Sequence, residues 1–454
     1  FIVALQGCKN GKAPGQDGVP AELLKIAIGR DQDGAPSIGP MGQAMLHLLN
    51  RVFRSGEIPE SWQESTVVSI PKKGDLAQCG NYRGISLMST MMKVLMRLVA
   101  TRVSAFLEDN DILSKNQAGF RKKEECPIQS GVFLEVMKRR QMNGDDTFVL
   151  FLDIQKAYDT VPQEALLKKL ERYGMGGRLL TFVERLYAAS FFRVRSCNML
   201  TRRYQLLRGV RQGCPLSPVL FNIFIDDIGG PKPGMEGAPP GVLVPFQRFY
   251  PYDQVVPREE DMEDDEPTQP PIRVPSLLFA DDTKAMAETA EDLQVEADRL
   301  TAWFQLNELK PHPDKSKVMW IAAEHHKLEK DKDKNDLSIS EELAAVAQEV
   351  RVRMTGVELE SVLTQKDLGL VIEPTLERRT IIQNRFESAR KAVFKMGPFL
   401  STVSIPVSCK IRVIQGVLIP MLLYGSEVYG MCREVTDGMQ RFVNEALRLA
   451  GGMS

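Results

Sequence analysis

Histidines and paired cysteines are scarce in this chain of 454 residues. It has four histidines and seven cysteines, and no two cysteines stand in a C-x-x-C pair. These ligands are too few and too scattered for a zinc-type cluster, and an odd number of dispersed cysteines is typical of reduced thiols in an intracellular compartment. We therefore expect a protein of the nucleus or the cytoplasm that is not secreted.

Long apolar runs are also missing. No stretch reaches the roughly 18 uncharged residues of a membrane-spanning helix. The best candidate, Val413 to Ser426, is shorter and contains Pro420. We expect no membrane segment. Because the chain begins with Phe1, we also expect it to be a fragment of a longer reading frame.

The charge is nearly balanced overall but not along the chain. Apolar residues make up 43% and charged residues 26%, as in an ordinary globular protein large enough for two or three domains. Residues 1–228 hold 31 Lys and Arg against 23 Asp and Glu, whereas residues 229–454 hold 27 against 36. The N-terminal half is therefore predicted to present a basic surface.

Part of the acidic excess lies in one short segment. Residues 258–266 read REEDMEDDE, and Pro-rich flanks surround them from Gly229 to Pro275. Such a stretch has too few apolar side chains to form a core, so it is predicted to be a solvated, flexible insertion.

Hydrophobic periodicity predicts alternating helices and strands before a mostly helical C-terminal part. A charged tract, residues 324–336, is predicted to be an exposed loop between the two. The last two expected helices, residues 381–396 and 409–423, carry basic residues. These residues would suit the backbone of a nucleic-acid duplex, or else they form a solvated helix face. Helices are expected from about residue 20, over 90–108, from about 162, and over 291–306, 381–396 and 409–423; strands are expected over 65–70, 148–154 and 317–321.

Carboxylates stand at the ends of two apolar β runs. Asp153 follows the run FVLFL, and Asp281 and Asp282 follow the run VPSLLFA. Adjacent carboxylates repel each other unless a cation neutralises them, so this pattern predicts a site for divalent metal ions. A surface turn is the alternative for the Asp-Asp pair. A divalent metal site of this kind points to phosphoryl transfer.

Seven sequence blocks follow one another along the chain: residues 11–18 (GKAPGQDG), 70–73 (IPKK), 81–87 (NYRGISL), 117–121 (QAGFR), 153–159 (DIQKAYD), 209–218 (GVRQGCPLSP) and 279–282 (FADD). In this order they resemble the blocks of the reverse transcriptases of non-LTR (LINE-like) retrotransposons. A later block, residues 423–428 (LYGSEV), resembles the segment that follows the polymerase core in that family.

The resemblance implies an α+β, right-hand polymerase fold with fingers, palm and thumb, an antiparallel palm sheet and a helical C-terminal part. Residues 1–145 would form the fingers with the helices that lead into the palm, and residues 146–323 the palm, with an acidic insertion over about 229–275. Residues 324–454 would form a connecting charged loop and a thumb-like helical part.

The resemblance also implies a reaction and its catalytic groups. The chain would be a nucleotidyltransferase that adds dNTPs to a DNA primer on an RNA template, with protein partners unknown. Asp153, Asp281 and Asp282 would hold two Mg²⁺ ions, with Mn²⁺ as a possible substitute. Lys315 matches a lysine that would protonate the leaving pyrophosphate, although Lys317 is an alternative.

Several residues would contact the nucleotide or the template. Tyr158 would lie under the sugar and exclude a 2′ hydroxyl, or else be a core tyrosine; Asp159 is as well explained by a capping role. Lys72, Lys73 and Arg83 would bind the triphosphate, or else be solvated basic residues, and Arg121 would contact template phosphates. Gln212 and Gly213 would form a turn against the incoming nucleotide and the template strand, or else a purely structural turn.

Some positions depart from the family pattern. Gly84 replaces a usual proline, residues 123–127 (KEECP) replace a usual Gly-Arg-Ser-Thr-like stretch, and Asp367 stands where an aromatic residue is usual. These departures favour a catalytically silent nucleic-acid-binding remnant, which the intact carboxylates oppose. An RNA-dependent RNA polymerase is a further alternative, which Tyr158 opposes.

Overall fold

The computed structural model describes residues 1–72, 74–196, 199–231, 236, 239–245, 270–323, 329–330, 337–338, 345, 347–376, 378–430 and 432–452. The backbone forms two compact units that alternate along the sequence. Unit 1 comprises Phe1–Arg121, Ile154–Ile228 and Ala302–Pro311, and unit 2 comprises Lys122–Asp153, Gly229–Thr301 and His312–Ser454. The division into fingers, palm and thumb stays a prediction.

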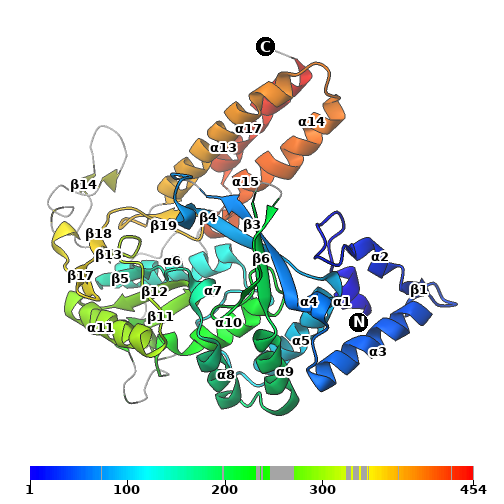
Figure 1. Cartoon of the computed structure of the whole chain (residues 1–454). Helices are drawn as coiled ribbons and strands as arrows, with labels where there is room; N and C mark the ends of the chain where they lie inside the picture. The colour runs from blue at the N-terminus through cyan, green and yellow to red at the C-terminus, as the bar shows by residue number, and fades with distance from the viewer. Residues whose placement is uncertain are drawn as a thin grey trace. The chain divides into compact units, whose positions relative to one another are not determined.

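Unit 1 combines a small sheet with helices (Figure 1). Its sheet has the order β4-β3-β6-β7, with β8 paired to β6, and β3 runs antiparallel to β4 but parallel to β6. Its elements are α1 (Ile2–Gln6), α2 (Ala21–Lys25), β1 (Ile28–Arg30), β2 (Pro36–Ile38), α3 (Pro40–Ser55), α4 (Glu60–Gln63), β3 (Glu64–Pro71), η1 (Cys79–Asn81), β4 (Tyr82–Leu87), α5 (Thr90–Asp109), α7 (Ala157–Thr160), α8 (Gln163–Arg172), α9 (Gly177–Ala188), β6 (Phe191–Ser196), β7 (Met199–Leu200), β8 (Tyr204–Gln205), α10 (Ser217–Ile225) and η2 (Asp226–Gly229), which ends at the start of unit 2.

The predicted elements of unit 1 are confirmed with small shifts. Helix α5 begins where Ser89 caps it, since the Ser89 side chain accepts a hydrogen bond from the Met92 amide at 3.5 Å. Its apolar side, including Leu95 and Val99, is buried. Strand β3 contains the predicted run of residues 65–70, where β-branched side chains favour the extended backbone.

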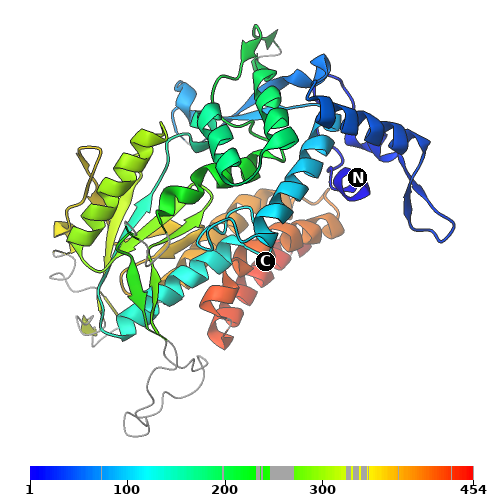
Figure 2. The ribbon, with the colours of Figure 1, turned by 90° about the horizontal axis from the view of Figure 1, so that it is seen from below.

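Unit 2 is built on a second sheet and a bundle of C-terminal helices. The part of α11 that belongs to this unit lies beside the strands of its main sheet (Figure 2). Its elements are α6 (Cys126–Met142), β5 (Thr147–Leu152), β9 (Val242–Val244), β10 (Ile272–Val274), β11 (Ser276–Phe279), β12 (Asp282–Ala287), α11 (Ala290–Leu306), β13 (Lys317–Ile321), β14 (Glu329–Lys330), β15 (Leu337–Ser338), β16 (Arg353–Met354), β17 (Val357–Glu358), β18 (Glu360–Ser361), β19 (Gln365–Asp367), β20 (Leu370–Ile372), α13 (Arg378–Ser401), α14 (Val407–Val413), the π-helical turn Ile414–Leu418, α15 (Ile419–Leu423), α16 (Ser426–Tyr429) and α17 (Arg433–Gly451).

The main sheet of unit 2 is antiparallel except at one edge. Its order is β11-β12-β5-β13-β18, and only β18 runs parallel to its neighbour. Phe133 and Met137 of α6 pack on one sheet face in a buried cluster with Val149 and Phe151 of β5. A mixed α+β architecture with a largely antiparallel sheet is therefore observed, as the sequence predicts.

Two predictions need correction or delimitation. Residues 229–275 are not without folded structure throughout, because β9 and β10 pair antiparallel within this range; the acidic segment 258–266 lies outside the described residues. Apolar cross-strand pairs such as Val242 with Val274 pack in a hydrophobic cluster and stabilise this strand pair, which the composition of the segment did not reveal. Of the charged tract 324–336, only Glu329–Lys330 is described, and it pairs with β15.

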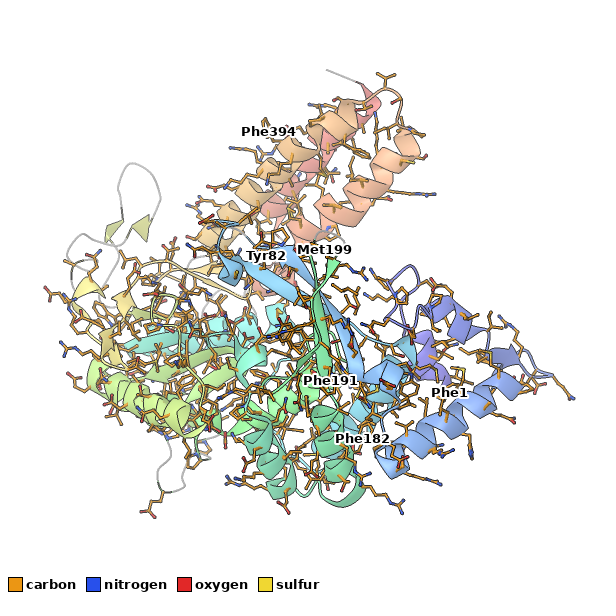
Figure 3. The ribbon with its side chains drawn as sticks, in the orientation of Figure 1. Phe1, Tyr82, Phe182, Phe191, Met199 and Phe394 are labelled. Atoms are coloured by element: carbon orange, nitrogen blue, oxygen red, sulfur yellow. The ribbon has the colours of Figure 1, made fainter. Side chains whose placement is uncertain are left out.

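The C-terminal helices pack on one another around a separate core. Figure 1 shows α13, α14 and α17 running side by side, and buried Val393, Leu418 and Ala446 belong to their common hydrophobic cluster. The predicted helix 409–423 is three consecutive segments that begin at Val407. Phe394 of α13 lies outside this core and is 84% exposed (Figure 3).

Candidate active site

The Asp281–Asp282 pair lies on a tight hairpin between β11 and β12. Phe279 pairs directly with Asp282, so Ala280 and Asp281 form a two-residue turn. Ala280 has a φ of 57°, a left-handed conformation that costs a residue with a Cβ on the order of 1 kcal/mol. Buried Leu277 and Leu278 hold the strand, which explains how the turn keeps this conformation.

Asp153 lies at the same end of the sheet as Asp282. The β12–β5 ladder ends with the pair Thr283 and Leu152, and Asp282 and Asp153 are the next residues beyond that pair on the two strands. The three carboxylates that the sequence singled out are therefore brought to one end of one sheet.

Negative charge is concentrated at this end of the sheet. The pKa of the Asp282 carboxyl is raised to about 6, although this residue is exposed. The largest cause is desolvation by the surrounding protein, followed by the negative charge of Asp281 and then by other carboxylates, including Asp153. Excess negative charge of this kind fits a divalent cation. Within the described part of the chain, no three His, Cys, Asp or Glu side chains are already arranged to hold a metal ion.

The raised pKa predicts how stability depends on pH. Between its usual pKa of 3.8 and about 6, Asp282 binds a proton more tightly in the folded chain than in the unfolded one, so the stability of the metal-free protein falls as the pH rises through this window. We expect Asp282→Asn to raise the free energy of unfolding above pH 6 by about 1 kcal/mol, a value reduced for solvent exposure.

Thermal unfolding in EDTA at several pH values measures this effect. Native and variant melting temperatures should differ above pH 6 and converge below pH 4, and Mg²⁺ should stabilise the native chain more than the variant. If the melting temperatures of the two proteins depend on pH in the same way, the charge of Asp282 does not destabilise the folded protein.

Lys315 and Lys317 have different surroundings, which the sequence could not distinguish. The Lys315 Nζ lies 3.4 Å from the Asp153 Oδ2, and its side chain is 63% exposed. The Lys317 Nζ instead contacts Glu360 and donates to the Asp314 carbonyl at 2.7 Å. Lys315 is therefore the lysine that stands at the carboxylates.

Tyr158 lies in an aromatic stack within unit 1. Its ring is parallel to that of Phe221, with centroids 4.6 Å apart, and meets the edge of Phe120 at 6.3 Å. Tyr158 is partly buried, and Lys156, two residues before it, has a φ of 50°. This packing fixes the ring in place. It is compatible both with a ring that would exclude a 2′ hydroxyl and with a core tyrosine.

The Gln212–Gly213 turn is joined to the segment that carries Tyr158. The Gln212 Nε2 donates to the Asp159 Oδ1 at 2.8 Å, so Asp159 fastens this turn. Gly209 has a φ of 83°, and a Cβ there would lie 2.7 Å from the Asp159 carbonyl oxygen. The glycine is thus required for close approach of the two segments.

The predicted phosphate contacts have mixed surroundings. Lys72 and Arg83 are exposed at the end of the β3–β4 hairpin, next to Tyr82, which Figure 3 labels. Lys73 lies outside the described residues. The Arg121 guanidinium forms a bidentate pair with Glu108, at 2.8 and 2.6 Å, and donates to two carbonyls of the preceding loop, so it fastens its own loop.

Sequence reasoning missed one charged pair beside the carboxylates. The Lys284 Nζ lies 2.7 Å from the Asp367 Oδ2, and both side chains are buried. A lysine inside the strand DTKAMA was a visible signal, because a charged residue within a buried strand needs a partner. Its partner is 83 residues away in the chain.

Comparison with known protein families decides the class. The family model described as "Reverse transcriptase (RNA-dependent DNA polymerase)" matches residues 70–359, more than half of the chain. The chain belongs to the reverse transcriptase family. This match includes all three carboxylates, and family membership implies a polymerase fold and a divalent metal ion.

The curated relatives of this reverse transcriptase come from mobile elements. It is 30% identical over 226 residues to the Pol polyprotein of the type-1 retrotransposable element R2 of Popillia japonica, covering 50% of this chain and 29% of that protein. It is 23% identical over 427 residues to the RNA-directed DNA polymerase of the mobile element jockey of Drosophila melanogaster, covering 90% and 40%. The predicted kinship with non-LTR retrotransposons is confirmed.

The matched relatives are much longer proteins. The chain spans 29% of the R2 protein and 16% of the 149 kDa protein of transposon TX1 from Xenopus laevis, to which it is 28% identical over 225 residues, 49% of this chain. A solved apo telomerase from Candida tropicalis aligns at 10% identity over 78% of this chain and 65% of that one, with a TM-score of 0.39.

Among the described helices, none has the length and apolarity to cross a bilayer.

Proposed function

We propose that this reverse transcriptase chain is an RNA-directed DNA polymerase that adds deoxynucleotides to a primer 3′ end on an RNA template. The position of Asp153 and Asp282 next to the last pair of the β12–β5 ladder, with Asp281 beside them, carries the proposal. The elevated pKa of Asp282 supports it, because perturbation by desolvation together with neighbouring carboxylates is common at functional sites.

Each carboxylate has a defined task in this proposal. Asp153, Asp281 and Asp282 would hold divalent cations, Mg²⁺ or in its place Mn²⁺. Bound in a pair, such cations lower the charge barrier for attack of a hydroxyl on a phosphate. Lys315 would give a proton to the departing pyrophosphate, and its position beside Asp153 supports that role over Lys317.

The residues of unit 1 would bind the incoming nucleotide. The stack on Phe221 supports Tyr158 as a rigid surface under the sugar. Gln212 and Gly213, fastened by Asp159, would lie against the base pair being formed. Exposed Lys72 and Arg83 would grip the triphosphate, where an arginine offers two parallel donors. The contacts of Lys73 and Arg121 with nucleic acid stay predictions.

Primer extension by the purified chain tests the proposal. An RNA template with a DNA primer, dNTPs and Mg²⁺ should yield extended DNA, and EDTA should abolish it. A chain that binds RNA in a salt-sensitive way but extends nothing would be the silent remnant that Gly84 and residues 123–127 favour.

The sugar of the incoming nucleotide provides a separate prediction. Tyr158→Ala removes the ring, so the ratio of kcat/KM for a ribonucleotide to that for its deoxynucleotide should rise about 10- to 100-fold. Tyr158→Phe keeps the ring and its stack on Phe221 and should keep native selectivity. Single-nucleotide incorporation with matched dNTP and rNTP measures both. Unchanged selectivity in the alanine variant would make Tyr158 a core residue, and native use of ribonucleotides would favour an RNA polymerase.

A further inference from the structure

Ser316 is a buried serine between Lys315 and the first residue of β13. Its relative exposure is 0%, although Lys315, its neighbour in the chain, is exposed. A buried hydroxyl needs hydrogen-bond partners, because it has lost those that water would provide. Both partners of the Ser316 hydroxyl are backbone groups beside the carboxylate site.

The Ser316 hydroxyl joins two segments of unit 2. It accepts a hydrogen bond from the Asp153 amide at 3.2 Å and donates one to the His312 carbonyl at 3.0 Å. Asp153 follows the last residue of β5, and its amide is bound by this side chain rather than by the backbone of a neighbouring strand. The hydroxyl thus fixes the backbone of a predicted metal ligand.

The other side of the Asp153 peptide is bound by the same loop, residues 312–316, which we call the lysine loop. The His312 amide donates to the Asp153 carbonyl at 2.9 Å. The amides of Lys315 and Ser316 both donate to the His312 carbonyl, at 3.1 and 2.9 Å. Asp153 is therefore held at its amide and at its carbonyl by one short loop.

The lysine loop also presents Lys315 to the Asp153 side chain. The Lys315 Nζ lies 3.4 Å from the Asp153 Oδ2, although the lysine side chain is 63% exposed. An exposed lysine loses much rotamer freedom when it is held in one place, so the position of its backbone decides how often the ammonium group reaches the carboxylate. The Ser316 hydroxyl links the backbone of the lysine loop to the backbone that presents this carboxylate.

We propose that Ser316 is a positioning residue whose hydroxyl sets the distance between the Asp153 carboxylate and the Lys315 ammonium group, so that the cation ligand and the proton donor act on the same nucleotide. The effect on the reaction rests on the proposed polymerase function. The fixing of the lysine loop does not, and it is measured separately.

Hydrogen exchange tests whether Ser316 fixes the lysine loop. Ser316→Ala removes both hydrogen bonds, so the amides of residues 312–316 should exchange about 10-fold faster than in the native chain. Ser316→Thr keeps a hydroxyl and should keep slow exchange. Ser276→Ala is the matched control, because Ser276 is also buried but its hydroxyl has no hydrogen-bond partner among the described residues. Native exchange of the lysine loop in Ser316→Ala would overturn the proposal.

Primer extension then tests the positioning of the reacting groups. At saturating primer–template, Ser316→Ala should lower kcat about 10-fold and leave the KM for dNTP within about twofold of native, because misplaced groups slow the chemical step. Ser316→Thr and Ser276→Ala should keep native kcat. In a Lys315→Met background, Ser316→Ala should lower kcat by less than about threefold, since the distance that it sets no longer matters.

The outcomes of the two measurements are distinct. Equal losses of kcat in the native and Lys315→Met backgrounds would show that Ser316 does not act through Lys315, which would overturn the proposal. Native kcat in Ser316→Ala despite faster exchange would make the two hydrogen bonds a purely structural contact. If the native chain extends no primer, the polymerase function fails, and the exchange rates still decide whether Ser316 fixes the lysine loop.

Discussion

Replacing Asp153 with asparagine is expected to slow primer extension about 10³-fold while leaving the protein folded. Asparagine keeps the size of the side chain but removes one of the charges that would hold the cations, and a loss of about 4 kcal/mol in transition-state stabilisation corresponds to that factor. Since Asp153 follows the last residue of β5 and its side chain is 33% exposed, its carboxylate contributes little to the core.

Single-turnover extension at saturating Mg²⁺, together with circular dichroism and thermal unfolding, measures this change. Asp298→Asn is the matched control, because Asp298 is an exposed carboxylate on α11. It should extend primers at the native rate. An Asp153→Asn variant with native activity would refute the site, whatever the family of the chain.

Replacing Lys315 with methionine is expected to lower kcat by about 100-fold, within the range of general acid catalysis by one side chain. The expectation follows from the 3.4 Å separation between the Lys315 Nζ and the Asp153 Oδ2, which places an ammonium group at the carboxylate site. Lys317→Met is the matched control. Lys317 is engaged with Glu360, so its loss should change kcat less than threefold.

The pH dependence of extension distinguishes an acid from a simple cation at this position. With a general acid, the plot of kcat against pH for the native chain should fall at high pH, and the methionine variant should lack that fall. If Lys317→Met is the variant with the large defect, the assignment of the two lysines is reversed.

The stretches that the sequence predicted well are those with local signals. Strand β13 was predicted with its observed bounds, and the predicted helix 90–108 ends one residue short of α5, because periodicity and caps act within a few residues. The carboxylate positions also followed from local pattern, since apolar runs that end in Asp are short-range features. The family resemblance was visible for the same reason, as ordered blocks of adjacent residues.

The features that the sequence could not predict depend on long-range contacts. The β9–β10 ribbon joins segments on either side of a charged insertion, and composition pointed the other way. Arg121 lies in a recognisable block, yet its guanidinium is occupied by Glu108 and loop carbonyls. Neither contact leaves a periodic trace in the sequence.

The sequence by itself determined the class of this protein: an α+β chain of the reverse transcriptase family with carboxylates at the ends of two strands. Only the tertiary structure decided that Asp282 and Asp153 lie at the same end of one sheet, that Lys315 rather than Lys317 contacts Asp153, and that Lys284 pairs with Asp367. Backbone propensity and hydrophobic period are set by neighbours in the chain, whereas strand register and buried charge pairing are set by packing between segments far apart in sequence.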